Sequence, residues 1–186
     1  PIPATCDPGS FLNATLDRCI GCPAGRVCVG GASQPRPCSR GGFCAANVSR
    51  STYCPSGRYG SETGLSDASC SGECEQGYYC EAGSVSGKAA PCAEGSYGNA
   101  TGLESQANCT ACPEGHSCGV GVSEPTPCSA GAVQPNTSQG ACASCDAGKY
   151  QGDGSKTSCF DCTPGAFCLE GASAGLPCPS GRHQNG

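Results

Sequence analysis

Hydrophobic residues are sparse in this chain and follow no helical period. Leu, Ile, Val and Phe together make 19 of the 186 residues, and Met and Trp are absent. No stretch keeps the spacing of an amphipathic helix, and Gly and Pro recur throughout. The pattern predicts almost no helix and, at most, short two-stranded β-hairpins between irregular segments.

Cysteine takes the place of the missing hydrophobic core. So few large apolar residues would ordinarily leave a chain disordered. The 21 cysteines supply another constraint, because cross-links lower the entropy of the unfolded chain. We therefore predict a small disulfide-rich fold, irregular with short β-hairpins and almost no helix, arranged as an elongated rod of tandem repeats.

The cysteines follow a repeat. Every odd-numbered cysteine, counted from the N-terminus, is followed at the third position by glycine, as Cys22 is by Gly25. One such pair would carry little weight, but eleven in register indicate a small unit copied along the chain. We call each unit a tile and its first cysteine the opening cysteine. The opening cysteines are Cys6, Cys22, Cys38, Cys54, Cys74, Cys92, Cys112, Cys128, Cys145, Cys162 and Cys178.

The tiles are of two kinds. In a short tile the next cysteine lies six positions on, and in a long tile it lies 13 to 17 positions on and a Cys-x-x-Cys (once Cys-x-x-x-Cys) leads into the next tile. After a lead-in at 1–5, the long tiles are tile 1 (6–21), tile 4 (54–73), tile 6 (92–111), tile 8 (128–144) and tile 9 (145–161). The short tiles are tile 2 (22–37), tile 3 (38–53), tile 5 (74–91), tile 7 (112–127) and tile 10 (162–177), and an incomplete, truncated tile occupies 178–186.

Two disulfide schemes fit this spacing. Pairing each cysteine with its nearest neighbour inside a tile uses twenty cysteines and leaves Cys178, whose tile ends before a partner appears. The rival scheme crosses the short tiles and joins Cys22 to Cys38 and Cys28 to Cys44. We favour the first, which predicts Cys6–Cys19, Cys22–Cys28, Cys38–Cys44, Cys54–Cys70, Cys74–Cys80, Cys92–Cys109, Cys112–Cys118, Cys128–Cys142, Cys145–Cys159 and Cys162–Cys168.

Aromatic residues recur five positions after the opening cysteine. With so little else apolar, we expect each to pack on the disulfide of its own tile, and each tile to stack on its immediate neighbours alone. Matched Thr-Gly-Leu turns at 63–65 and 101–103 should shape hairpins in the long loops. The packing aromatics predicted in this way are Phe11, Phe43, Tyr59, Tyr79, Tyr97, Tyr150 and Phe167.

Sequons point to the secretory route. Of six asparagines, five stand in Asn-x-Ser/Thr, which predicts N-linked glycans at Asn13, Asn47, Asn99 and Asn136, with Asn108 uncertain because Cys109 is its middle residue. Dense disulfides require an oxidising compartment. We expect an extracellular or cell-surface location for a mature or excised piece of a secreted protein. We expect no cofactor other than covalent glycans.

Other chemistry is weakly indicated. A net charge of −5 gives no basic stripe for nucleic acid, and no apolar segment is long enough to insert in a membrane. Cys142, Cys145, Cys159 and Cys162 have the spacing of a zinc site, but they belong to the tile series. His116 and His183 have no nucleophile and acid around them, so we expect neither a metal site nor an enzyme.

The long tiles resemble a known repeat. CPSGRYGSETGLSDASCSGEC from Cys54 and CAEGSYGNATGLESQANCTAC from Cys92 resemble ephrin-receptor-like cysteine-rich repeats and, more loosely, the first module of tumour-necrosis-factor-receptor repeats. The resemblance implies the pairs Cys54–Cys70 and Cys92–Cys109. The short tiles depart from the animal receptors and look like the tandem repeats of long extracellular proteins of algae and other unicellular eukaryotes.

Two functions follow as hypotheses. The first is a non-enzymatic structural segment, a disulfide-stapled and N-glycosylated rod in a longer stalk, coat or filament such as a flagellar hair-like fibre. Its partners would be neighbouring repeats of the same longer chain, further copies in self-assembly, or other extracellular proteins. The alternative is a receptor or adhesion ectodomain that binds a protein ligand. Arg36, Arg40, Arg50 and Tyr53 form the best candidate patch for it, although we favour a solvated basic face at these residues.

Overall fold

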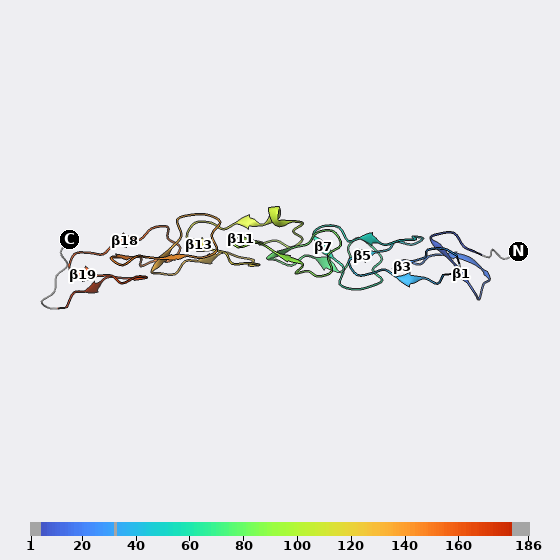
Figure 1. The fold of residues 1–186 in the computed structure, drawn as a ribbon, viewed down its shortest axis with the longest axis horizontal. Coiled ribbons are helices and arrows are strands. Elements are labelled where there is room, and N and C mark those ends of the chain that lie inside the picture. The colour runs from blue at the N-terminus through green and yellow to red at the C-terminus, as the bar shows by residue number, and fades with distance from the viewer. Residues whose placement is uncertain (1–4, 32, 180–186) are drawn as a thin grey trace. The chain divides into compact units, whose positions relative to one another are not determined.

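The computed structural model describes residues 5–31 and 33–179. Within these ranges the chain forms twenty short β-strands, one 3₁₀ helix, η1 (Gln106–Asn108), and ten disulfide bonds. Irregular segments connect the short strands (Figure 1). The prediction of a disulfide-rich hairpin fold with almost no helix is confirmed.

Each tile from 1 to 10 contains one antiparallel hairpin. The residues four and five positions after the opening cysteine pair with the last two residues of the same tile, as Arg26 pairs with Pro37 and Val27 with Arg36. The hairpins are β1 (Ser10–Asn13) with β2 (Arg18–Gly21), β3 (Arg26–Val27) with β4 (Arg36–Pro37), β5 (Gly42–Phe43) with β6 (Thr52–Tyr53), β7 (Arg58–Tyr59) with β8 (Gly72–Glu73), β9 (Tyr78–Tyr79) with β10 (Ala90–Pro91), β11 (Ser96–Tyr97) with β12 (Thr110–Ala111), β13 (His116–Ser117) with β14 (Thr126–Pro127), β15 (Ala132–Val133) with β16 (Ala143–Ser144), β17 (Lys149–Tyr150) with β18 (Phe160–Asp161), and β19 (Ala166–Phe167) with β20 (Leu176–Pro177).

Cystine forms the interior. Among the residues that the structure describes, the buried apolar positions are fourteen cysteines and Val133. Short tiles bury both of their cysteines, with Cys162 the half-buried exception. Long tiles bury the opening cysteine and leave its partner half-buried. Short hairpins with so little apolar surface depend on these cross-links for their shape.

A glycine turn follows each opening cysteine. We call the glycine at the third position the turn glycine, and in tiles 1 to 10 its φ lies between 73° and 90°. Only glycine adopts this left-handed conformation without steric cost, which explains its recurrence. The turn glycine donates its N–H to the carbonyl of the sixth-position residue of the next tile, at 2.7–2.9 Å in eight junctions, as Gly25 does to Cys44.

A second left-handed position ties each tile to the one before it. This residue, nine positions after the opening cysteine in short tiles and ten in long tiles, donates its N–H to the opening cysteine carbonyl of the preceding tile at 2.8–3.0 Å. We call it the left-handed residue. Its nine examples are Gly31, Asn47, Gly64, Gly83, Gly102, Gly121, Ser138, Ser155 and Gly171.

Packing extends to the next tile but one. A Cβ placed on Gly9 of tile 1 would lie 2.5 Å from the carbonyl oxygen of Asn47 in tile 3, and one on Gly57 would lie 2.5 Å from that of Gly102 in tile 6. Seven turn glycines have such a contact, all closer than 3.0 Å. The expectation that each tile contacts its immediate neighbours alone is therefore wrong. A turn glycine has no side chain, so the loop from two tiles further on can approach its backbone.

The chain divides into two compact units. Of the described residues, the first unit holds those up to 90 together with 100–108, and the second holds 91–99 and those from 109 onward. Tile 6 is shared, because its loop at 100–108 packs with the first unit while its hairpin belongs to the second. Every junction hydrogen bond and glycine contact described above joins residues of one unit.

Candidate functional site

The disulfides join nearest neighbours within tiles. All ten pairs of the favoured scheme are present, with Cα–Cα distances of 5.7–6.1 Å, and the crossed bonds of the rival scheme are not formed. Cys178 is half-buried and has no disulfide partner among the described residues.

The cysteines with zinc-like spacing are all oxidised. Cys142 is bonded to Cys128, Cys145 to Cys159, and Cys162 to Cys168. A cysteine must be a thiolate to bind zinc, so none of the four can act as a ligand in this state. In the part of the chain that the structure describes, no three His, Cys, Asp or Glu residues are grouped as metal ligands.

Two buried glutamines occupy the sixth position of tiles 8 and 9, where a short tile has a cysteine. The Nε2 of Gln151 donates to the Ser158 carbonyl at 2.7 Å, and its Oε1 accepts the Asp153 N–H at 3.1 Å. Gln134 makes the same pair of bonds to Ala141 and Asn136, at 2.6 and 3.1 Å. Each amide thus braces a long loop from inside, where a short tile has its second cysteine. Neither residue was predicted from the sequence, although their shared sixth position was a usable signal.

The seven fifth-position aromatics are half-buried rather than fully covered. Tyr59 lies against two glycines, since Cβ atoms placed on Gly72 and Gly87 would be 3.7 and 3.0 Å from its ring. Tyr150 meets Phe160 across its own hairpin, with ring centroids 6.0 Å apart and a tilt of 48°. The rings stay half-buried because a two-stranded hairpin has no second layer to enclose them.

The sequon asparagines lie mainly at the surface. Asn47, Asn99, Asn108 and Asn136 are exposed, whereas Asn13 is half-buried and its Oδ1 accepts the backbone N–H groups of Thr15 and Leu16. The Oδ1 of Asn108 accepts bonds from the N–H and hydroxyl of Ser105, within the turn that contains η1. The disulfide of Cys109 and the β12 strand at Thr110 further restrict this sequon.

An ion pair inside tile 4 also accepts a hydrogen bond from tile 6. Arg58 lies 3.2 Å from the Oε1 of Glu73, and the Thr101 hydroxyl donates to the Oε2 of Glu73 at 2.7 Å. Thr101 is also the third residue of the Asn99 sequon. The side chains of Arg36, Arg40, Arg50 and Tyr53 make no hydrogen bond or ion pair with one another in the described structure. Tyr53 is 75% exposed, with its ring against Gly83.

Two further surface carboxylates are held by hydrogen bonds that shift their pKa. Lys149 lies 2.8 Å from Asp161 across β17 and β18; its hydrogen bond and charge lower the pKa of Asp161, and those of Asp161 raise the pKa of Lys149. Hydrogen bonds from the Ser69 and Ser66 side chains and the Ser69 backbone lower the pKa of Asp67. His116 is half-buried in β13, with Nδ1 2.9 Å from the Glu114 carbonyl oxygen, and His183 lies outside the described residues.

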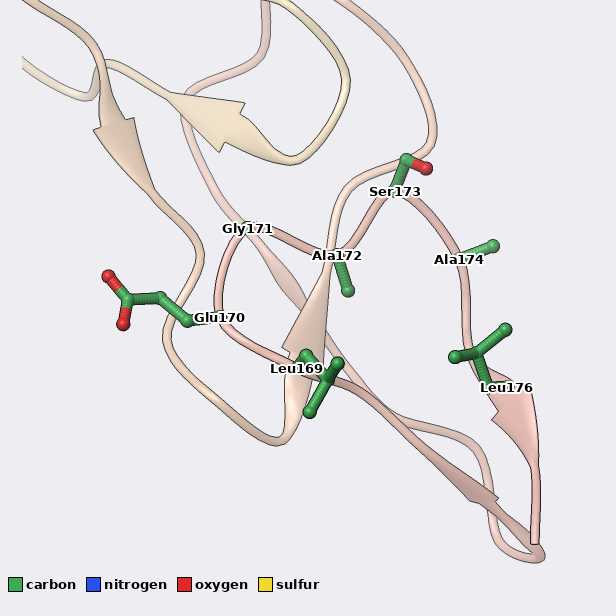
Figure 2. A pocket seen from close by; sticks show the side chains of 7 residues that line it. All are labelled: Leu169, Glu170, Gly171, Ala172, Ser173, Ala174 and Leu176. Atoms are coloured by element: carbon green, nitrogen blue, oxygen red, sulfur yellow. The ribbon is translucent and has the colours of Figure 1, made fainter.

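The loop of tile 10 surrounds an open hollow of about 350 Å³. Leu169, Ala172 and Leu176 point into it and Glu170 points away (Figure 2). The lining offers aliphatic surface and backbone groups, with no pair of titratable groups suited to acid–base chemistry. The arrangement fits an inserted apolar side chain better than a reacting substrate.

Comparison with protein-family models and with curated proteins finds no match. Among the described residues, no helix has the length and hydrophobicity needed to cross a membrane. The ten disulfides are consistent with an extracellular or secreted protein.

Proposed function

We propose that the chain is a non-enzymatic extracellular structural segment, a disulfide-stapled and N-glycosylated rod within a longer stalk, coat or filament. The same proposal includes a relationship of its tiles to the ephrin-receptor-like repeats that they resemble. The supporting observation is the uniformity of the tile junctions. Both kinds of tile use the same turn glycine, left-handed residue and backbone bonds, whatever side chains their loops carry.

The mechanism is mechanical. Disulfides inside each tile fix its shape, and the backbone bonds between tiles fix its orientation to the next. Because the junction bonds involve main-chain atoms and glycine, the loops are free to vary and to carry glycans. The partners are neighbouring repeats of the same longer chain, with self-assembly or other extracellular proteins as lateral contacts.

Small-angle scattering tests the rod. A compact chain of this length would have a radius of gyration of about 16 Å, and a series of tiles packed only on the next two should exceed it clearly. Negative-stain images of native material separate a filament from a single rod. A compact radius of gyration would contradict the proposal.

Mass spectrometry of native material tests the glycans. We expect sugar at Asn13, Asn47, Asn99 and Asn136, whereas Asn108 serves as an internal comparison because its sequon is held by a disulfide and a strand. Unmodified asparagine at most of the four would remove the protective role of the glycans and the secretory argument based on them.

A binding role has one observation in its favour. Tyr53 exposes 75% of its surface, as an anchor residue of a protein interface does before its partner binds. If the chain is an adhesion or receptor module, Tyr53→Ala should abolish capture of a protein ligand from the native surface, while Tyr78→Ala, at a half-buried tyrosine, should not.

A further inference from the structure

The burial of each turn glycine shows how far its tile is covered by the tiles that follow it. Those of tiles 1 to 8 are buried, Gly148 of tile 9 is half-buried, and Gly165 of tile 10 is exposed. A Cβ placed on Gly148 or Gly165 would have no atom within 4 Å, in contrast to the close contacts at Gly115 and Gly131. The change follows from the packing rule, because a turn glycine is covered by the next two tiles.

The backbone of tile 10 shows the same difference. In the other four short tiles the sixth-position cysteine donates its N–H to a loop carbonyl of the following tile at 2.9–3.1 Å; the acceptors are Val48, Leu65, Leu103 and Gln139. The opening cysteine carbonyls of those tiles accept from a left-handed residue. Within the described residues, the Cys168 N–H and the Cys162 carbonyl have no such partner.

The four short tiles that are covered by a following tile indicate which residues the uncovered face of tile 10 can accept. At three of the four, the residue that supplies the carbonyl is aliphatic and follows the left-handed residue directly, as in Asn47-Val48, Gly64-Leu65 and Gly102-Leu103. At tile 10 the Cys168 N–H is followed by Leu169, which lines the hollow with Ala172 and Leu176 (Figure 2). A left-handed residue followed by Leu or Val would satisfy both backbone groups and bring an aliphatic side chain to this apolar surface.

We propose that Cys162, Gly165, Cys168 and the adjoining hollow form a docking face for a further disulfide-closed tile, which presents a left-handed residue followed by Leu or Val. The face continues an interface already formed along the chain. The first tile of a second copy does not match it, because its own left-handed residue is Asp17, whose N–H is bonded to the Asn13 carbonyl at 2.9 Å and which is followed by Arg18 and not by Leu or Val. The proposal concerns tile packing and holds independently of the extracellular role.

A tile extension provides the test. Residues 1–177 are followed directly by a second copy of 54–91, so that copied tiles 4 and 5 follow tile 10 as the original tiles 4 and 5 follow tile 3. The copied Gly64 should donate to the Cys162 carbonyl, the copied Leu65 should accept from Cys168, and the copied Gly60 should accept from Gly165, as at tile 3. Amide hydrogen exchange at Cys168 and Gly165 should slow by about tenfold or more relative to the 186-residue chain.

The matched control carries Gly64→Pro in the copied segment alone. Proline lacks the N–H and cannot adopt the left-handed conformation, while the copied disulfides remain available. We expect this control to leave exchange at Cys168 as fast as in the 186-residue chain. Disulfide mapping shows that the added tiles have formed.

Three results would overturn the proposal. The first is unchanged exchange at Cys168 when the added disulfides have formed. The second is equal protection in the Gly64→Pro control, which would mean that the left-handed turn is not what docks. The third is concentration-dependent dimerisation of the 186-residue chain that protects Cys168, which would assign the face to a second copy.

Discussion

Short and long tiles build the same hairpin with different cross-links. Tile 7 closes a six-residue separation between Cys112 and Cys118, and both cysteines are fully buried. Tile 9 closes a separation of 14 residues between Cys145 and Cys159, and only Cys145 is buried. Both tiles nevertheless form the same two-residue strand pairing and the same junction bonds.

The difference shows which residues determine the tile. The opening cysteine, the turn glycine and the left-handed residue are shared, so they specify the hairpin and its junctions. The position of the second cysteine decides what occupies the sixth position. A short tile places that cysteine there, whereas tile 9 places Gln151 there and bridges the loop with an amide.

The largest expected effect is the loss of one disulfide from each type. The chain-entropy model gives about 2 kcal/mol for the Cys112–Cys118 loop and about 3 kcal/mol for the Cys145–Cys159 loop. Each buried sulfur that is removed leaves a small cavity worth about 1 kcal/mol, two in tile 7 and one in tile 9. The double alanine variants should therefore lose stability alike, by about 4 kcal/mol in denaturant unfolding. A gap of more than about 2 kcal/mol would show that the types are not equivalent.

The turn glycines test whether position outweighs tile type. Gly115→Ala in a short tile and Gly131→Ala in a long tile should each cost about 3 kcal/mol, from left-handed alanine and a clash with a carbonyl oxygen of the next tile but one. Gly165→Ala, also left-handed but in open space, should cost about 1 kcal/mol. Equal losses of unfolding free energy at all three would contradict the next-but-one contact.

The next largest effect is expected at the buried side-chain amide of Gln151 in tile 9. Gln151→Ala should cost about 2 kcal/mol, because the Ser158 carbonyl and Asp153 N–H lose their partner. Gln139→Ala, at an exposed glutamine, is the control and should cost less than about 0.5 kcal/mol.

Replacing Gln151 by glutamate tests the same hydrogen bond through its dependence on pH. In Gln151→Glu, burial beside a carbonyl should raise the folded pKa of the new carboxyl group, since only the protonated form can donate to Ser158. The stability of this variant should approach that of the parent below pH of about 4.3 and fall as pH rises through the raised pKa. A variant whose stability relative to the parent does not change with pH would show that the amide's donation to Ser158 is unimportant.

The smallest effect is expected at the exposed pair of tile 9. Because the folded pKa of Asp161 is lowered, its contribution is present above the ordinary value of 3.8 and is lost as pH falls through the lowered pKa. Because the folded pKa of Lys149 is raised, its contribution is present below 10.5 and is lost as pH rises through the raised pKa. In Lys149→Gln, an NMR titration should find the pKa of Asp161 moved up toward its ordinary value. No movement would show that the two charges do not interact in solution.

Much of the fold could be predicted because its determinants are local. A constant six-residue cysteine separation and the glycine at the third position specify a closed turn, whichever residues lie between. The hairpin of tile 2, for example, lies wholly inside the tile that the cysteine spacing defines. No long-range pairing had to be guessed.

The relation between tiles could not be predicted in the same way. Asn47, Ser138 and Ser155 adopt the same left-handed conformation as glycine, at φ values of 63°, 59° and 57°, so composition does not mark the position. The contact between Gly9 and Asn47 joins residues two tiles apart and depends on the path of the loop. Gln134 and Gln151 were missed because a polar residue in a Gly-rich loop ordinarily lies in solvent.

The pairing of each cysteine with the next one along the chain affects how the protein can be synthesised. As the chain emerges N-terminus first, the correct partner of every opening cysteine is the first one to follow it, so oxidation in order of appearance needs no later reshuffling. Covering of the turn glycine requires the next two tiles and therefore lags behind. The newest stretch of a nascent chain is cross-linked before it is packed, and an error of oxidation there stays confined to a single tile.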